Sequence, residues 1–253
     1  MIRKLIFKIK NKELLIYLKW KITKFQKNPV LEIRLNILKF QLNKSIENPK
    51  KYLELKFKIL KINKSDINEH MQTLYEYAKK SETVFETGVR GVVSTWALLR
   101  GLHENSSNEK KIFVNDIEKC DIEEILHVAN NLDVHFEYEW INNLNINIKE
   151  NYDLVFIDTW HVYGQLIREL HKFSKICNKF IILHDTTIDG EVGESIRNNW
   201  NIQKQAKETG YTVEEIEKGL WPAVEDFLNS NDEWILEKRY TNCNGLTILK
   251  KID

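Results

Sequence analysis

The stretches YDLVFIDTWHVYGQLIREL (residues 152–170) and KFIILHDTT (residues 179–187) decide how this chain folds. Each begins with an apolar run long enough for a buried strand, and the two runs end in Asp158 and Asp185. The residues between the runs, 164–177, have the spacing of a helix. Near-continuous apolar strands separated by a helix are typical of a parallel sheet that is covered on both faces.

The same alternation extends toward the N-terminus. Earlier strands are predicted over TVFETG (83–88), KIFVND (111–116) and VHFEYEW (134–140), with helices over residues 92–102 and 120–132. Asp66 and Glu69 resemble the capped start of another helix, which we expect to continue through residue 80. Residues 65–185 are thus predicted to supply five parallel strands.

The end of the chain has a different pattern. Two strand-like runs, WILEKRY (234–240) and GLTILKK (245–251), are joined by TNCN, a connection short enough for an antiparallel hairpin. Residues 186–233 look helical, and Pro222 is well placed for a first helical turn. The predicted fold class is α/β, a doubly wound Rossmann-like sheet of seven strands with helices on both faces.

Length and composition agree with one large domain or with one domain and an arm. The chain has 253 residues, of which 42% are hydrophobic and 30% charged, which excludes a fully disordered chain. Its cysteines, Cys120, Cys177 and Cys243, form no CxxC pair, which disfavours a disulfide scaffold or structural zinc and favours a cytoplasmic location. No apolar run approaches the ~20 residues of a membrane-spanning helix.

Charge divides the chain in two. Residues 1–64 carry a net charge of +14, whereas residues 65–253 carry −13. We therefore expect a basic helical arm over residues 1–64 ahead of the main domain. Three roles stay open for this arm: packing on the domain or a partner chain, docking on an anionic membrane surface, and binding a polyanion. No zinc-finger or RNA-binding signature supports nucleic acid as the partner.

Residues with chemical potential follow the predicted strands, where open α/β sheets bind ligands. Gly88 and Gly91 would let a ligand approach the backbone, and Asp116 at the end of the second strand could accept the hydroxyls of a ribose. The glycines do not complete GxGxxG, Arg90 would crowd a pyrophosphate, and Glu86 suits a cationic ligand. These residues point to a nucleoside without a phosphate chain, although a tight turn and a capping Asp would explain them equally well.

A second group lies at the ends of the fourth and fifth strands. Asp158, His161, His184 and Asp185 offer two carboxylates and two imidazoles, a set that would suit Mg²⁺ or Mn²⁺. A neutral histidine beside the cation would act as general base on a substrate hydroxyl. The alternative is a set of capping or ion-paired residues with no ligand.

The segments VFETGVRGVVST, IFVND, YDLVFIDTWHVYGQL, FIILHDTT and GLTIL together resemble class I S-adenosylmethionine-dependent methyltransferases. More narrowly, DTWHVY and ILHDT resemble the cephalosporin hydroxylase-like group and the macrolide sugar O-methyltransferases. The resemblance covers residues 65–253 and implies a seven-stranded sheet with an antiparallel last strand.

The resemblance and the positions of residues at the strand ends together give candidate roles to individual residues. The candidate cofactor-binding residues are Glu86, Gly88, Arg90, Gly91, Ser94, Asp116 and Asp158. The candidate metal ligands are Asp158, His184 and Asp185, with Mg²⁺ as the implied ion, and His161 is the candidate general base. The chain departs from its relatives at His184, which stands where they have a carboxylate.

The sequence thus predicts an S-adenosylmethionine-dependent O-methyltransferase that acts on a hydroxyl of a small molecule, sugar or glycan. Residues 186–233 would form a lid and part of the acceptor pocket, and the chain would be able to form a homo-oligomer. Two alternatives remain: a nucleotide-dependent oxidoreductase, which the missing GxGxxG disfavours, and a non-catalytic scaffold or binding protein that keeps the fold.

Overall fold

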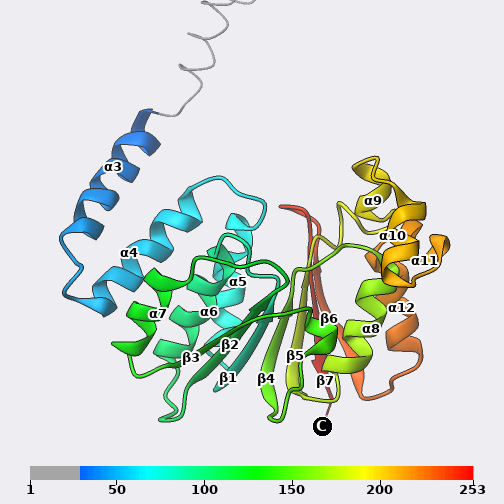
Figure 1. Cartoon of the computed structure of the whole chain (residues 1–253). Helices are drawn as coiled ribbons and strands as arrows, with labels where there is room; N and C mark the ends of the chain where they lie inside the picture. Colours follow the sequence, from blue (N-terminus) through cyan, green and yellow to red (C-terminus); the bar gives the residue numbers. More distant parts are fainter. Residues whose placement is uncertain (1–28, 253) are drawn as a thin grey trace, which may run out of the picture.

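The structure is a computed structural model that describes residues 29–252. The first 28 residues of the predicted basic arm lie outside the described residues. One seven-stranded sheet forms the centre of the molecule, with the strand order β3-β2-β1-β4-β5-β7-β6 (Figure 1). The strands are β1 (Thr83–Thr87), β2 (Lys111–Asp116), β3 (His135–Trp140), β4 (Tyr152–Ile157), β5 (Cys177–His184), β6 (Trp234–Tyr240) and β7 (Leu246–Lys251).

The directions of the strands confirm the predicted fold class. Strands β1 to β5 run parallel to one another, whereas β7 runs antiparallel to both β5 and β6. The turn between β6 and β7 includes Cys243, Asn244 and Gly245, all with positive φ angles. The chain reverses tightly there, as the short connection in the sequence predicted.

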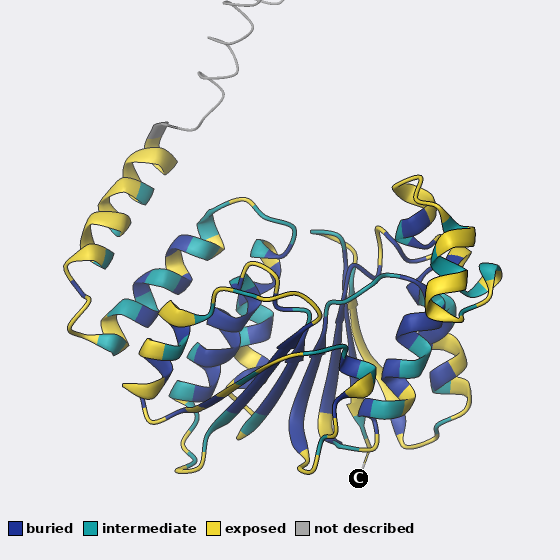
Figure 2. Cartoon of the chain, viewed as in Figure 1, coloured by how far each residue is buried: buried dark blue, intermediate teal, exposed yellow. Residues whose placement is uncertain are grey.

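Helices cover both faces of the sheet. On one face lie α4 (Pro49–Ile62), α5 (Met71–Ala78), α6 (Val93–Glu104) and α7 (Glu123–Asn130), and on the other lie α8 (Tyr163–Phe173) and α12 (Leu220–Asn229). Neighbouring strand residues serve different cores: Val84 packs with the first group and Phe85 with the second. Since side chains alternate along a strand, only a continuous apolar run fills both cores. The inner strands β1, β2, β4, β5 and β7 are accordingly mostly buried, whereas the edge strands β3 and β6 are mostly exposed (Figure 2).

The register of the sheet aligns the carboxyl ends of its parallel strands. Thr87 pairs with Asn115 on β2 and with Ile157 on β4, and Ile157 pairs with Leu183 on β5. The residues that follow each of these positions therefore meet at one edge of the sheet, which is where the sequence places its candidate site.

Helix α4 is part of the folded domain, although the charge pattern assigns it to the basic arm. Its side chains Leu53 and Phe57 are 1% and 2% exposed and pack in the core beneath α5 and α6. The side chain of Asn48 caps the helix by accepting the backbone N–H of Lys51 at 2.9 Å. The net charge of the chain thus changes sign at residue 64, although the helix before that position packs against the domain. The boundary between arm and domain at residue 64 stays a prediction.

Helix α3 (Pro29–Asn43) projects from the body and contacts α4 (Figure 1). It exposes apolar side chains at three- and four-residue intervals: Val30, Ile33, Ile37 and Phe40 are each more than half exposed. Residues 29–43 and 49–62 of the segment that the sequence predicts as a helical arm are helical. None of the helices among residues 29–252 is long and apolar enough to cross a membrane.

The predicted helix cap at Asp66 is wrong. A short 3₁₀ turn (Asn68–His70) precedes α5, which begins at Met71, and neither start has a side-chain cap. The carboxylate of Asp66 instead accepts a hydrogen bond from the guanidinium of Arg90, far along the chain. The local pattern of acids predicted a helix cap, but the carboxylate of Asp66 forms a long-range ion pair with Arg90 instead.

The segment between β5 and β6 is helical, as predicted. It contains α9 (Glu194–Arg197), α10 (Ile202–Thr209), α11 (Val213–Glu217) and α12, with Pro222 in the first turn of α12. Helix α12 packs against α8, and Phe227 is fully buried there. The shorter helices α9 to α11 lie nearer the carboxyl ends of the strands (Figure 1), and their role as a lid stays a prediction.

Candidate active site

The loop after β1 approaches the end of β4 so closely that it requires glycine. At Gly88 the φ angle is +88°, and a Cβ there would lie 1.8 Å from the carbonyl oxygen of Asp158. Gly91 differs, because a Cβ at that position would meet nothing nearer than a Val93 methyl at 4.0 Å among the described residues. Packing therefore explains Gly88 but not Gly91, where the missing side chain leaves room beside the loop.

Asp116 holds this loop in place. One of its carboxylate oxygens, Oδ2, accepts the backbone N–H groups of Val89 and Arg90 at 2.8 and 2.9 Å, and Oδ1 accepts the N–H of Glu118 at 2.8 Å. Arg90 and Val92 have positive φ angles of 40° and 61°, an uncommon backbone conformation for residues with side chains. The predicted ribose acceptor thus also organises the predicted cofactor loop.

Glu86 is a fully buried carboxyl group beneath the same loop. It accepts a hydrogen bond from the hydroxyl of Ser94, while its Oε2 is buried without a hydrogen-bond partner among the described residues. Burial raises the pKa of Glu86 to about 8, and the charges of Asp158 and Asp116 act in the same direction. A cation placed beside Glu86 would favour its ionised form.

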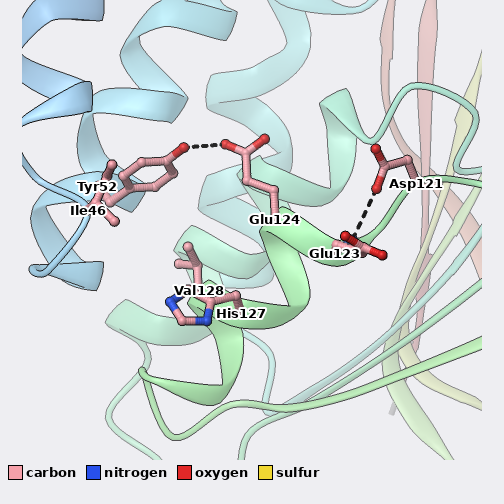
Figure 3. A pocket seen from close by; sticks show the side chains of 7 residues that line it. All are labelled: Ile46, Tyr52, Asp121, Glu123, Glu124, His127 and Val128. Atoms are coloured by element: carbon pink, nitrogen blue, oxygen red, sulfur yellow. Dashed lines mark hydrogen bonds between the residues drawn. The ribbon is translucent and has the colours of Figure 1, made fainter.

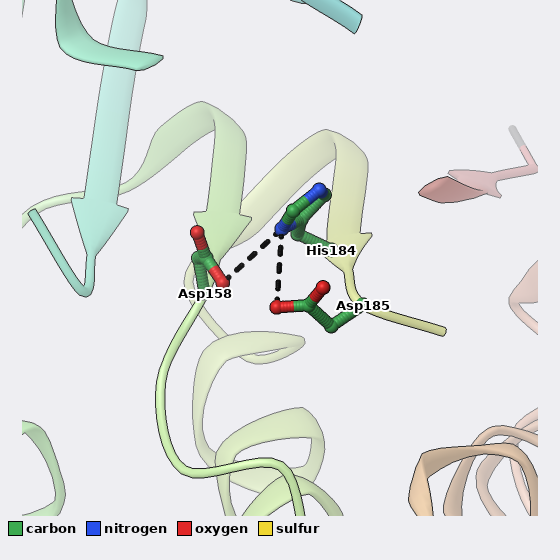
Figure 4. Close-up of side chains that lie close together, drawn as sticks. All are labelled: Asp158, His184 and Asp185. Atoms are coloured by element: carbon green, nitrogen blue, oxygen red, sulfur yellow. Dashed lines mark hydrogen bonds and ion pairs between the residues drawn. The ribbon is translucent and has the colours of Figure 1, made fainter. Parts of the chain in front are cut away.

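The three candidate metal ligands converge at the ends of β4 and β5 (Figure 4). Nδ1 of His184 lies 3.4 Å from Oδ1 of Asp158 and 3.3 Å from Oδ2 of Asp185. One ligand atom from each residue lies within 4.8 Å of the other two. The structure therefore brings together all three residues that the sequence proposed as metal ligands.

His161 lies among four carboxylates. Its Nε2 is 3.3 Å from Asp158 and 3.2 Å from Asp185, and its Nδ1 is 3.0 Å from Asp189 and 2.9 Å from Glu194. Burial alone would lower the pKa of His161, but these acidic partners raise it well above 6.5. The carboxylates on both edges of the ring therefore favour its protonated form, in which neither nitrogen accepts a proton.

The acids also control the other titrating groups of the site. Burial opposes a charge on His184, but Asp158 and Asp185 raise its pKa to about 10. Burial likewise opposes ionisation of Asp158, but His184 and His161 hold the pKa of that carboxyl well below its usual value. Positive charge is therefore strongly favoured between Asp158 and Asp185.

Asp189 and Glu194 were not recognised in the sequence. They follow β5 in the segment before and within α9, and neither belongs to a strand end. Asp189 is fully buried and accepts two hydrogen bonds from Arg197, at 2.5 and 2.9 Å. Because Arg197 already compensates Asp189, this second group of acids orients His161 without needing a metal ion.

A buried polar network supports the loop that carries Asp158 and His161. Glu169 on α8 is fully buried, and its Oε1 accepts Asn143 at 2.5 Å, Thr159 at 2.7 Å and Gln165 at 2.7 Å. Gln165 in turn accepts the hydroxyl of Tyr211 at 2.8 Å. The network connects the loop after β4 to the helical segment that contains Tyr211. The amphipathic spacing of α8 is the one feature of the sequence that points to this network.

The structure contains a small cavity at the candidate site and a larger one elsewhere in the domain. A cavity of about 10 Å³ lies beside one candidate metal ligand, His184, and is also lined in part by His161 and Glu169. A larger one, of about 450 Å³, lies between α4 and α7 and is lined by Tyr52 and Glu124 among others (Figure 3). In the larger cavity Glu124 is already bonded to Tyr52 at 2.5 Å and to Lys56 at 2.6 Å, so its charge is compensated.

No protein-family model matches this sequence, and no curated protein matches it. Several solved structures are similar to it at low sequence identity. An O-methyltransferase of Streptomyces achromogenes involved in tomaymycin synthesis, in complex with SAM, is 12% identical with a TM-score of 0.49, and the match covers 74% of this chain and 81% of that one.

Two further methyltransferase structures match at similar levels. The SAH-bound methyltransferase of Podospora anserina is 12% identical with a TM-score of 0.48, over 79% of this chain and 88% of that one. The O-methyltransferase of Bacillus cereus in complex with SAH is 13% identical with a TM-score of 0.45, over 73% and 81%.

Proposed function

We propose that this chain is an S-adenosylmethionine-dependent O-methyltransferase acting on a hydroxyl of a small molecule, sugar or glycan. The observation that carries the proposal is the meeting of two groups at one sheet edge. Gly88 of the predicted cofactor loop lies against Asp158, and Asp158 lies within 3.3 Å of His161. A cofactor held by the loop and a hydroxyl held beside His161 would therefore be neighbours.

The loop residues fit the parts of this cofactor. The unpartnered Oε2 of Glu86 suits the ammonium group of the methionine portion, and Gly91 leaves room for it to approach. The carboxylate of Asp116 has acceptor capacity left for a ribose hydroxyl beyond its three backbone N–H groups. Beyond Asp116, Ile117 and Trp140 are 67% and 59% exposed and offer an apolar surface for a base.

The acceptor hydroxyl would lie on the side of His161. Nδ1 of His161 faces Asp189 and Glu194, which fix the orientation of the ring. A divalent cation held by Asp158, His184 and Asp185 would lower the pKa of a bound hydroxyl and compensate the two aspartates. With the two aspartates compensated in this way, the carboxylates that face Nε2 of His161 would hold its proton less strongly, and Nε2 would be placed to remove the hydroxyl proton as general base.

Methyl transfer itself needs little further chemistry from the protein. The cofactor supplies an activated methyl group, so the chain contributes orientation, desolvation and removal of the hydroxyl proton. Trp160, which stacks on Tyr211 with ring centroids 5.9 Å apart and bonds Ser195 at 3.1 Å, borders the same region. We propose that residues 186–233 shape the acceptor pocket there.

We also propose that the basic arm docks the enzyme on an anionic carrier, membrane surface or partner chain. The exposed apolar residues of α3, such as Ile33 and Phe40, together with the positive charge of residues 1–64, support this proposal. Binding of anionic vesicles to the full chain, compared with neutral vesicles, would test it. Equal affinity for both would count against a role for the arm's charge.

The central test is calorimetric titration of the purified full chain with S-adenosylhomocysteine. We expect micromolar binding that Asp116→Ala abolishes, because the variant loses both the ribose acceptor and the anchor of the loop. Asp121→Ala, which removes an exposed carboxylate, serves as the matched control and should bind normally. His161→Ala should also bind the cofactor product normally but lose turnover. No binding by the folded wild-type protein would refute the methyltransferase proposal and favour a scaffold.

A further inference from the structure

His184 is held in one orientation by a contact from outside the site. Its Nε2 lies 3.2 Å from the backbone carbonyl oxygen of Asp66, which can only accept a hydrogen bond. Nε2 must therefore carry the hydrogen, and the lone pair of the neutral ring is on Nδ1. A second contact of this kind fixes the tautomer of most histidines that bind metals.

The fixed ring directs Nδ1 at the two carboxylates. Nδ1 lies 3.4 Å from Asp158 and 3.3 Å from Asp185, and Figure 4 shows these three groups turned toward one another. The side chain of His184 is fully buried. His70 packs against it edge-on at 5.9 Å, and Nε2 of His70 itself contacts the carbonyl of Asn242 at 2.9 Å. The ring of His184 thus has little freedom to turn away.

Asp185 supplies an independent sign that a ligand belongs here. Its side chain is 91% buried, since only 9% of it is exposed, yet its Oδ1 has no hydrogen-bond partner among the described residues. Its backbone also has a φ angle of +57°, a conformation that costs free energy for a residue other than glycine. A buried carboxylate oxygen without a partner is expensive. Oδ2 is the oxygen that faces His184, so a cation held by both oxygens of Asp185 would also satisfy Oδ1.

The donor set of this site is two carboxylate oxygens and one imidazole nitrogen. Mg²⁺ prefers oxygen ligands and water, whereas first-row transition ions accept imidazole more readily, Mn²⁺ the least readily among them. We infer that Asp158, His184 and Asp185 form a site for a divalent transition ion such as Mn²⁺, with Nδ1 of His184 as a ligand, and that Mg²⁺ binds there less tightly. The inference deepens the proposed function, on which its catalytic role rests, but metal binding is measured without methyl transfer.

The second histidine near the carboxylates is not expected to supply the nitrogen ligand. Nε2 of His161 also faces Asp158 and Asp185, but its Nδ1 faces Asp189 and Glu194. Arg197 is the other charged side chain bonded to Asp189. His161 is therefore surrounded by acids on both edges, in contrast to His184, whose Nε2 faces a neutral carbonyl group.

The test uses Mn²⁺ and Mg²⁺ alone with the purified full chain. Calorimetry should give an affinity for Mn²⁺ at least about tenfold higher than for Mg²⁺, and pulsed electron paramagnetic resonance of the Mn²⁺ complex should show coupling to a directly bound ¹⁴N. His184→Gln keeps a side-chain N–H donor for the carbonyl oxygen of Asp66 but removes the ring nitrogen Nδ1. The variant should therefore lose the ¹⁴N coupling and bind Mn²⁺ more weakly. His184→Asp should reverse the preference toward Mg²⁺.

His135→Gln, which changes an exposed histidine, is the matched control and should retain the wild-type affinity and spectrum. Equal or tighter binding of Mg²⁺ by the wild type would overturn the inference, as would ¹⁴N coupling that persists in His184→Gln. If His184→Asp does not fold, the wild-type and His184→Gln spectra still decide. A ¹⁴N-coupled Mn²⁺ site in a protein that does not bind S-adenosylhomocysteine would refute the proposed function and leave this inference standing.

Discussion

Replacing Glu86 with glutamine should remove a specific part of the pH dependence of this protein's stability. The folded state holds Glu86 with a pKa of about 8, against an ordinary value of 4.5, because the carboxyl is fully buried. Between these two pH values the folded chain binds more protons at this position than the unfolded chain does. The free energy of unfolding therefore decreases as pH rises through this window.

The size of the effect follows from the two pKa values. Each pH unit within the window changes the free energy of unfolding by about 1.4 kcal/mol, so the contribution of Glu86 falls by about 3 kcal/mol between pH 5 and pH 7.5. Urea unfolding followed by circular dichroism measures this at several pH values. The Glu86→Gln variant should show a smaller loss of stability with pH than the wild type, because glutamine does not titrate.

Other groups also titrate in this range, so the comparison needs a control. Glu82→Gln changes an exposed carboxyl just before β1 and should keep the wild-type pH dependence. If Glu86→Gln and the wild type lose stability equally between pH 5 and 7.5, Glu86 is not protonated in the folded state and the reasoning fails. Calorimetric titration with S-adenosylhomocysteine in buffers of different ionisation enthalpy counts the protons released on binding. We expect the wild type to release a proton from Glu86 that the Glu86→Gln variant does not release.

Two further comparisons test the structure with matched variants. Gly88→Ala should lower the free energy of unfolding by more than about 3 kcal/mol, because its Cβ would lie 1.8 Å from a backbone oxygen. Gly91→Ala should change the free energy of unfolding by less than about 1 kcal/mol. The same Gly91→Ala variant should nevertheless bind S-adenosylhomocysteine about tenfold more weakly. Thermal unfolding and calorimetry measure both, and equal stability of the two variants would contradict the close approach at Gly88. Leu53→Ala should cost about 2–5 kcal/mol, as in a packed core, whereas Ile33→Ala on α3 should cost less than about 0.5 kcal/mol; equal losses in urea unfolding would show that α4 does not belong to the domain core.

The order of strands and helices could be predicted from the sequence because the sheet is buried on both faces. The inner parallel strands then have to be largely apolar runs, as residues 152–157 and 180–184 show, and such runs are visible without a structure. The location of the candidate site followed for the same reason, since the carboxyl ends of parallel strands share one edge. Asp158, His161, His184 and Asp185 could therefore be grouped from the sequence.

Contacts between distant segments could not be predicted. The carbonyl of Asp66 that orients His184 comes from 118 positions away in the chain, and the acid-rich pattern around Asp66 suggested only a local cap. Asp189 lies 28 positions after His161, in a segment without the apolar periodicity that marked the strand ends. Neither partnership leaves a periodic signal in the sequence.

The sequence by itself determined the architecture and the set of chemical groups at the sheet edge. Only the tertiary structure decided which atom of each group faces which partner: that His161 is enclosed by four acids, and that Nδ1 of His184 is directed at Asp158 and Asp185. Hydrophobic periodicity reports the face that a residue occupies within its own element. The protonation and ligand properties of a side chain depend instead on charges and carbonyl groups that folding brings within about 3 Å of it.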